Sequence, residues 1–80
     1  MTFTDFVLSQ RLARAYRMLS DPLRAGQKIS TVAFDAGFGD LSYFNRVFRR
    51  RFGAAPSEVK AAAYENLQRQ QGLGVTRQSL

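Results

Sequence analysis

The feature that most constrains this chain is a break between two helical patterns, centred on the sequence Gly37-Phe38-Gly39-Asp40. Apolar residues recur at helical spacing over 31–36 and again over 41–52. Gly37 suits the positive φ that commonly ends a helix, and Asp40 can cap the helix that follows. The order of short helix, glycine turn and longer helix is that of a helix-turn-helix, which places its second helix in the DNA major groove.

The shorter helix is expected to begin after Ser30, whose side chain can cap it. Ile29 before this cap and Phe34 inside the helix would then form a hydrophobic staple. The residues expected to face inward from this helix and its turn are Val32, Ala33, Ala36 and Phe38. Phe38 should fix the angle between the two helices.

The longer helix, over 41–52, has two sides. The apolar side consists of Leu41, Phe44, Val47, Phe48 and Phe52. The polar side consists of Ser42, Asn45, Arg46 and Arg49, and it is flanked by Tyr43, Arg50 and Arg51. Arginine can bond guanine bidentately, asparagine can bond adenine, and serine can bond either, so the polar side has the chemistry to read base edges. A solvated surface helix has the same pattern, and this helix alone leaves both interpretations open.

Residues 2–19 predict the first helix. Thr2 can cap it, and Asp5, three residues on, would complete a capping box. Its apolar surface is broader than one neighbour needs and comprises Phe3, Phe6, Val7, Leu8, Leu12, Ala13, Ala15, Tyr16 and Leu19. The intervening Arg11, Arg14 and Arg17 predict a solvated face, with a phosphate contact as the alternative.

The remaining segments are less informative. Residues 20–28 contain Pro22 and predict a loop. Pro56 suits the first turn of a last helix, over 56–69. The negative charge of Glu58 in that turn interacts favourably with the helix dipole. Residues 70–80 have little to bury and are predicted to be a disordered tail.

The composition limits the function. Eighty residues make one domain at most, and 12 Lys and Arg against 6 Asp and Glu give a net charge of +6. Such a basic domain suits a polyanion, and the alternative is a soluble basic protein without one. The chain has no Cys and no His, which removes disulfides, the usual zinc ligands and a His general base.

We therefore expect no enzyme, no metal and no cofactor. No apolar run is long enough to span a bilayer, and the N-terminus does not resemble a signal peptide. The expected location is the cytoplasm, in association with the nucleoid. A membrane-active peptide is the weaker reading, because Pro22, Gly37 and Pro56 break the helices.

The residues just described resemble the signature of AraC/XylS-type bacterial transcriptional regulators. Three motifs carry the resemblance, which covers about residues 2–63: Ala33-x-x-x-Gly37-Phe38, Ser42-Tyr43-Phe44-x-Arg46-x-Phe48, and Phe52-Gly53-x-x-Pro56. The resemblance implies an all-α, homeodomain-like fold of four helices. Residues 1–63 would form the DNA-binding domain, with 2–19 as the central linker helix and 30–52 as the second helix-turn-helix of the family.

The resemblance also implies site residues for sequence-specific binding of double-stranded DNA. Base contacts would come from Leu41, Ser42, Asn45 and Arg46. Phosphate contacts would come from Tyr43, Arg49, Arg50 and Ser57. Ala55 stands where the family often has a Ser or Thr helix cap, a loss that would cost about 1 kcal/mol.

The resemblance does not extend to the family's first helix-turn-helix or to its effector-binding or dimerisation domain. One face of the helix over 2–19 is therefore expected to be bare. The alternative function is a protein-interaction or dimerisation fragment that uses this face and binds DNA weakly or not at all. Two further partners stay open: a second copy of the chain through the helix over 2–19, and RNA polymerase.

Overall fold

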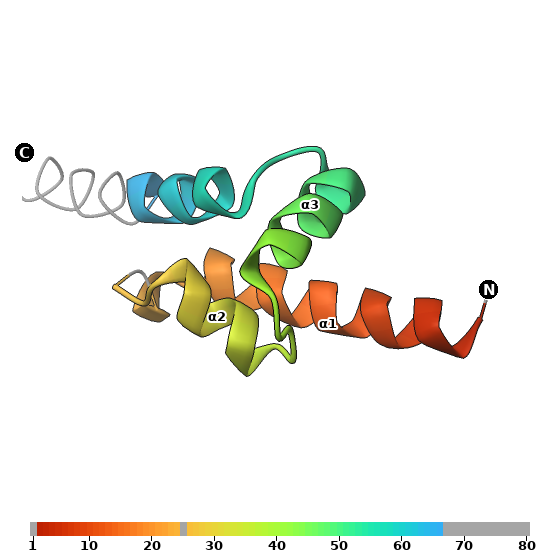
Figure 1. Cartoon of the computed structure of the whole chain (residues 1–80). Coiled ribbons are helices and arrows are strands. Elements are labelled where there is room, and N and C mark those ends of the chain that lie inside the picture. Colours follow the sequence, from red (N-terminus) through yellow and green to blue (C-terminus); the bar gives the residue numbers. More distant parts are fainter. Residues whose placement is uncertain (1, 25, 67–80) are drawn as a thin grey trace, which may run out of the picture.

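The computed structural model describes residues 2–24 and 26–66 and is drawn in Figure 1. Its elements are α1 (Phe3–Ser20), the 3-10 turn η1 (Pro22–Arg24), α2 (Ile29–Asp35) and α3 (Leu41–Phe52). The chain is helical again over 56–66. None of the described residues lies in a strand, so the all-α prediction is confirmed. The predicted end of the last helix at residue 69 and the predicted tail over 70–80 lie outside the described residues.

α1 begins with the capping box that the sequence predicts. The Thr2 hydroxyl accepts from the Asp5 N–H at 3.1 Å, and the Asp5 carboxylate accepts from the Thr2 N–H at 3.3 Å. Thr2 is thus the cap and not the first helical residue, and α1 spans 3–20 where 2–19 was expected. The helix ends at Asp21 because Pro22 follows.

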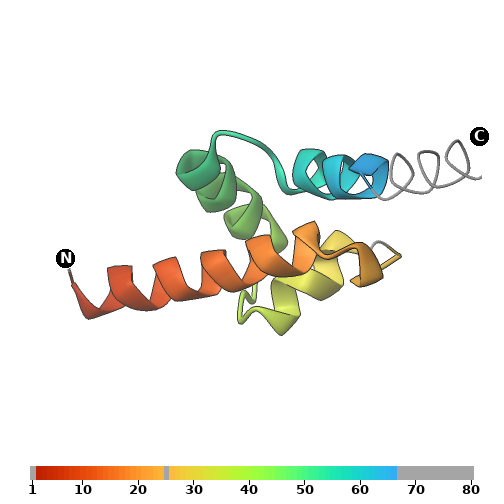
Figure 2. The same ribbon diagram turned by 180° about the vertical axis from the view of Figure 1, so that it is seen from behind.

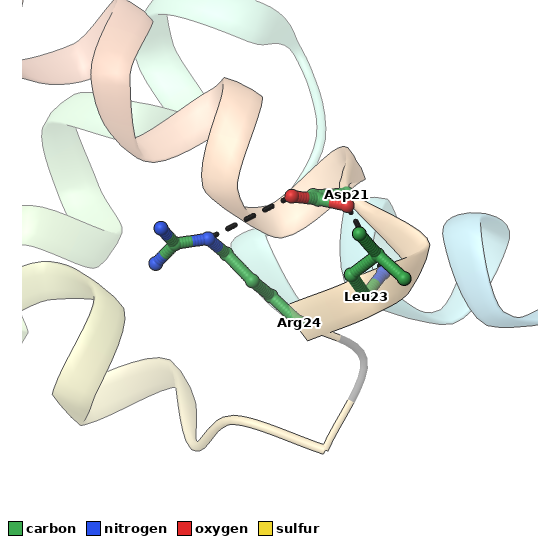
Figure 3. A network of polar contacts seen from close by, with 3 residues as sticks. All are labelled: Asp21, Leu23 and Arg24. Atoms are coloured by element: carbon green, nitrogen blue, oxygen red, sulfur yellow. Dashed lines mark hydrogen bonds and ion pairs between the residues drawn. The ribbon is translucent and has the colours of Figure 1, made fainter.

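The segment predicted as a plain loop contains the 3-10 turn η1. One oxygen of Asp21 accepts from the Leu23 N–H at 3.0 Å, and the other lies 3.7 Å from Nε of Arg24 (Figure 3). An aspartate that bonds the backbone two residues on stabilises a turn of this kind. The side chain of Asp21 therefore shapes the exit from α1.

The predicted start of the short helix is wrong. α2 begins at Ile29, its cap position is Lys28, and Lys28 makes no side-chain capping bond. Ser30 is inside the helix, so the predicted staple, which needs Ile29 outside it, is wrong as well. Ile29 packs against the core, whereas Phe34 is 54% exposed. Burial of Ile29 accounts for the earlier start, because packing routinely outweighs local preference at helix ends.

The core lies where α1, α2 and α3 meet, and its centre is aromatic. Phe44 and Phe48 are fully buried, with ring centroids 5.5 Å apart, and Phe48 lies 4.7 Å from Phe52. Tyr16 of α1 packs on Phe52 at 4.7 Å. The other buried core residues are Leu12, Ala15, Met18, Leu19, Val32, Ala33, Ala36 and Phe38. Figures 1 and 2 both show the N-terminal turns of α1 extending beyond the other helices.

None of the helices in the described part of the chain combines the length and the apolar character needed to cross a bilayer.

Candidate nucleic-acid interface

The turn between α2 and α3 is held by backbone bonds and one buried ring. Gly37 has φ 104°, and its N–H donates to the Phe34 carbonyl at 3.0 Å. The Phe38 N–H donates to the Ala33 carbonyl at 2.9 Å. The Phe38 side chain is 4% exposed and its ring lies 4.9 Å from that of Phe44. As predicted, Phe38 is a buried turn residue that links the two helices.

Both ends of α3 are defined by capping residues, and the first of them, Asp40, is the cap that the sequence predicted. Asp40 is the N-cap, and its carboxylate accepts from the Tyr43 N–H at 3.1 Å. Gly53 is the C-cap, with φ 73°, and its N–H donates to the Arg49 carbonyl at 2.8 Å. The helix is therefore 12 residues long with fixed ends, which makes it a rigid support for side chains.

The orientation of α3 about its axis follows from its buried residues. Phe44 and Phe48 point into the core, and Val47 and Phe52 pack against it. The predicted polar side is exposed at each of its four positions, Ser42, Asn45, Arg46 and Arg49. Leu41 lies at the edge of the apolar side and is 36% exposed. The structure thus brings three of the predicted base-contacting residues, Ser42, Asn45 and Arg46, to the outer surface of α3. The fourth, Leu41, lies at the edge of this surface and is partly exposed.

The basic residues of α3 add charge to this surface. Arg49, Arg50 and Arg51 are exposed in the last turn. The ion pair found within residues 2–24 and 26–66 joins Arg24 to Asp21, far from these arginines in the sequence. No ion pair in that part of the chain involves the arginines of α3, although Asp5 lines the same hollow as Arg46, Arg50 and Arg51.

One contact on this surface was not predicted. The guanidinium carbon of Arg46 lies 5.6 Å from the ring centroid of Tyr43, over the ring. The Tyr43 ring in turn lies 6.4 Å from that of Phe38 and is 40% exposed. The signal was present in the sequence, because residues three apart on a helix are neighbours.

Ser57, the remaining residue predicted to contact phosphate, lies at the start of the last helix. Pro56 is buried and Ser57 is exposed. The Glu58 carboxylate accepts from the Ala55 N–H at 3.3 Å, and the Glu58 N–H donates to the Ala55 carbonyl at 3.0 Å. Glu58 thus performs part of the capping that Ala55 cannot.

A separate apolar surface lies at the N-terminal end of α1. Phe3 is 80% exposed and Phe6 is 51% exposed. Beside them a groove of about 370 Å³ runs between α1 and the turn before α3. Its lining includes Phe3, Val7, Leu8, Arg11, Phe38 and Tyr43. The sequence predicted a bare face on this helix, and these exposed rings agree with it.

The side chains of the described residues form no cluster of candidate metal ligands. Within the described ranges, no three acidic residues come close enough together to hold a metal ion, and the sequence has no Cys or His.

Comparison with known proteins points to one family. Residues 1–62 match the family model described as "Helix-turn-helix domain". The chain is 44% identical over 64 residues to "Transcriptional activator RhrA" of Rhizobium meliloti, an alignment that covers 78% of this chain and 19% of that protein. It is 40% identical over 58 residues to the "Arabinose operon regulatory protein" of Escherichia coli, covering 72% of this chain and 19% of the relative.

A third relative is "Virulence regulon transcriptional activator VirF" of Yersinia enterocolitica, which is 34% identical over 55 residues, covering 69% of this chain and 19% of VirF. The chain therefore spans about a fifth of the length of the curated relatives it matches. No solved structure matches the chain.

Proposed function

The chain belongs to the helix-turn-helix domain of the AraC/XylS family of bacterial transcriptional regulators, which are not enzymes, and on that premise we propose that it binds double-stranded DNA in a sequence-specific manner. α3 would lie in the major groove and read bases through its outer side. The protein would act in the cytoplasm, in association with the nucleoid.

The observation that carries this proposal is the fixed rotation of α3. Because Phe44 and Phe48 anchor one side in the core, the side with Ser42, Asn45 and Arg46 must face outward. A helix whose ends are capped and whose buried side is aromatic loses little order when it binds, which favours affinity. Asparagine can bond adenine and arginine can bond guanine, so Asn45 and Arg46 carry the groups that base reading needs.

The other predicted contacts comprise one further base contact, Leu41, and four phosphate contacts, which would supply affinity without sequence preference. Leu41 is suited to touch a thymine methyl, since it is apolar and partly exposed at the start of α3. Tyr43, Arg49, Arg50 and Ser57 are the proposed phosphate contacts. Each neutralised phosphate releases counterions, so binding should weaken as salt rises.

The test is fluorescence anisotropy of labelled duplexes titrated with the protein at two salt concentrations. Duplexes enriched by the protein from a randomised library are compared with scrambled duplexes of the same composition. We expect tighter binding to the enriched duplexes at both salts, and Arg46→Ala should remove most of that preference. Equal binding to all duplexes, lost at the higher salt, would leave only a basic surface and would defeat the proposal.

A second candidate function rests on the exposed rings of α1. Phe3 and Phe6 and the groove beside them form an apolar surface at the N-terminal end of α1. Such a patch is typical of a protein contact. The chain would then pair with a second copy or with another protein, RNA polymerase included, and DNA binding would be weak or absent.

Two variants separate the candidates. Arg46→Ala removes a proposed base contact and leaves the α1 patch intact, whereas Phe6→Gln does the reverse. If the regulation of transcription is lost in Arg46→Ala and kept in Phe6→Gln, a protein contact through α1 cannot be the whole function. The opposite pattern would exclude DNA reading.

A further inference from the structure

A stack of three side chains, whose contacts with one another the proposed function does not explain, joins the turn before α3 to the outer side of that helix. Phe38 is buried in the turn, and the ring of Tyr43 lies against it. The guanidinium of Arg46 lies over the ring of Tyr43. The stack runs from the core of the protein to the proposed base-reading surface. Its order suggests that the core controls where the arginine lies.

We propose that Tyr43 is a positioning residue, which holds the Arg46 guanidinium in place for base contact through its ring and not a phosphate ligand acting through its hydroxyl. The inference rests on the proposed function. It replaces the phosphate contact at Tyr43 that the sequence predicted, and it leaves Arg49, Arg50 and Ser57 as the proposed phosphate contacts.

Tyr43 is well placed to hold a neighbour because it is held itself. Its backbone N–H donates to the Asp40 carboxylate at 3.1 Å, in the first turn of α3. Its ring lies 6.4 Å from that of Phe38, tilted by 47°. Phe38 is 4% exposed and packs on Phe44, so it cannot move without opening the core. The Asp40 cap therefore holds the backbone of Tyr43, and Phe38 supports its ring from one side.

The contact with Arg46 leaves the arginine able to bind. A cation over an aromatic ring is attracted by the electron density of the ring face. The guanidinium offers its flat face to such a ring, while its N–H donors lie in its plane and point outward at its edge. An arginine stacked in this way keeps the donors that bond guanine. It also loses less side-chain freedom on binding than an unrestrained one.

The two roles of Tyr43 predict opposite results for two substitutions. Tyr43→Phe keeps the ring and removes the hydroxyl, whereas Tyr43→Leu keeps apolar bulk and removes the ring. If the ring acts on Arg46, Tyr43→Phe should bind enriched duplexes like the wild type, and Tyr43→Leu should bind them about two- to five-fold more weakly. In an Arg46→Ala background, Tyr43→Leu should have no further effect on affinity.

A phosphate contact would give a different pattern. Tyr43→Phe would then weaken binding to enriched and scrambled duplexes alike, and Arg46→Ala would not cancel the effect. That result would overturn the inference. Thermal unfolding of each variant, followed by circular dichroism, ensures that affinities are compared between folded proteins.

An NMR measurement on the free protein separates this inference from the proposed function. A ring held over Arg46 should shift the Arg46 side-chain δ protons upfield in the wild type and in Tyr43→Phe, and the shift should vanish in Tyr43→Leu. Absence of the shift in the wild type overturns the inference, whatever DNA binding shows. If the shift is present but the wild type binds no duplex, the proposed function has failed, and the stack has no role in reading DNA.

Discussion

Gly37 and Gly39, which are separated by one residue in the turn before α3, have different roles. Gly37 has φ 104°, a conformation that side chains rarely adopt, and an added Cβ would lie 3.0 Å from Nε of Arg11. Arg11 is flexible and can move aside, so the backbone conformation is the main cost. Gly39 has no positive φ, and an added Cβ there would meet nothing within 4 Å.

Gly37→Ala should therefore destabilise the fold by about 1–2 kcal/mol, the cost of a left-handed conformation for a residue with a Cβ. Gly39→Ala is the matched control, and its unfolding free energy should stay close to that of the wild type. Urea denaturation measures both. Equal effects of the two substitutions would mean that the turn does not depend on the conformation of Gly37.

A second prediction at the scale of residues separates charge from reading. Arg50→Ala should weaken binding to enriched and scrambled duplexes alike and reduce the slope of log affinity against log salt by about one. Arg14→Ala removes the same charge from α1 and is the control for net charge. A loss of sequence preference in Arg50→Ala would place this residue among the base contacts, contrary to the account.

At the scale of elements, the sequence predicted α3 better than α2. Asp40 and Gly53 are local signals, and both act as caps in the structure. Ser30 is an equally good local signal, yet α2 begins at Ile29 because that side chain packs against the core. A contact between distant parts of the chain is invisible to a reading of neighbouring residues, and it decides where a helix of seven residues begins.

The candidate site shows the same division. The exposure of Ser42, Asn45 and Arg46 follows from helical periodicity alone, and the structure agrees. The contact of Tyr43 with Arg46 also follows from their spacing, whereas its contact with Phe38 needs the turn geometry, which periodicity does not supply.

The cap of α3 gives a prediction for the element as a whole. Asp40→Ala removes the carboxylate that accepts from the Tyr43 N–H, and it should cost about 1 kcal/mol of stability. For a domain of this size the midpoint of thermal unfolding should fall by about 4–8 °C. Asp35→Ala removes the same charge at the end of α2, away from any N-cap, and should change the midpoint little. A similar fall in both variants would indicate a charge effect and not a lost cap.

At the scale of the whole molecule, the chain presents two different surfaces. The outer side of α3 is polar and basic, whereas the N-terminal end of α1 is apolar and extends beyond the other helices in Figures 1 and 2. The aromatic core between them involves α1 and α3 directly, through Tyr16 and Phe52. Tyr43 also lines the groove beside Phe3, so variants that separate the two surfaces are made at other residues.

If the apolar surface mediates self-association, Phe6→Gln should weaken it about tenfold or more, because a buried Phe contributes about 1.5–3 kcal/mol. Leu23→Gln is the control, since Leu23 is 95% exposed in η1, away from this surface. Sedimentation velocity over a range of concentrations gives the association constants. An identical reduction in both variants would show that exposed apolar side chains associate without regard to site.

The central claim is that the outer side of α3 meets DNA, and an NMR titration tests it most directly. Labelled protein is titrated with an enriched duplex, and the backbone amide and arginine Nε signals are followed. The account predicts the largest shifts at Ser42, Asn45, Arg46 and Arg49, with Arg14 and Arg17 of α1 nearly unchanged. Shifts centred on the arginines of α1, with α3 unchanged, would contradict it.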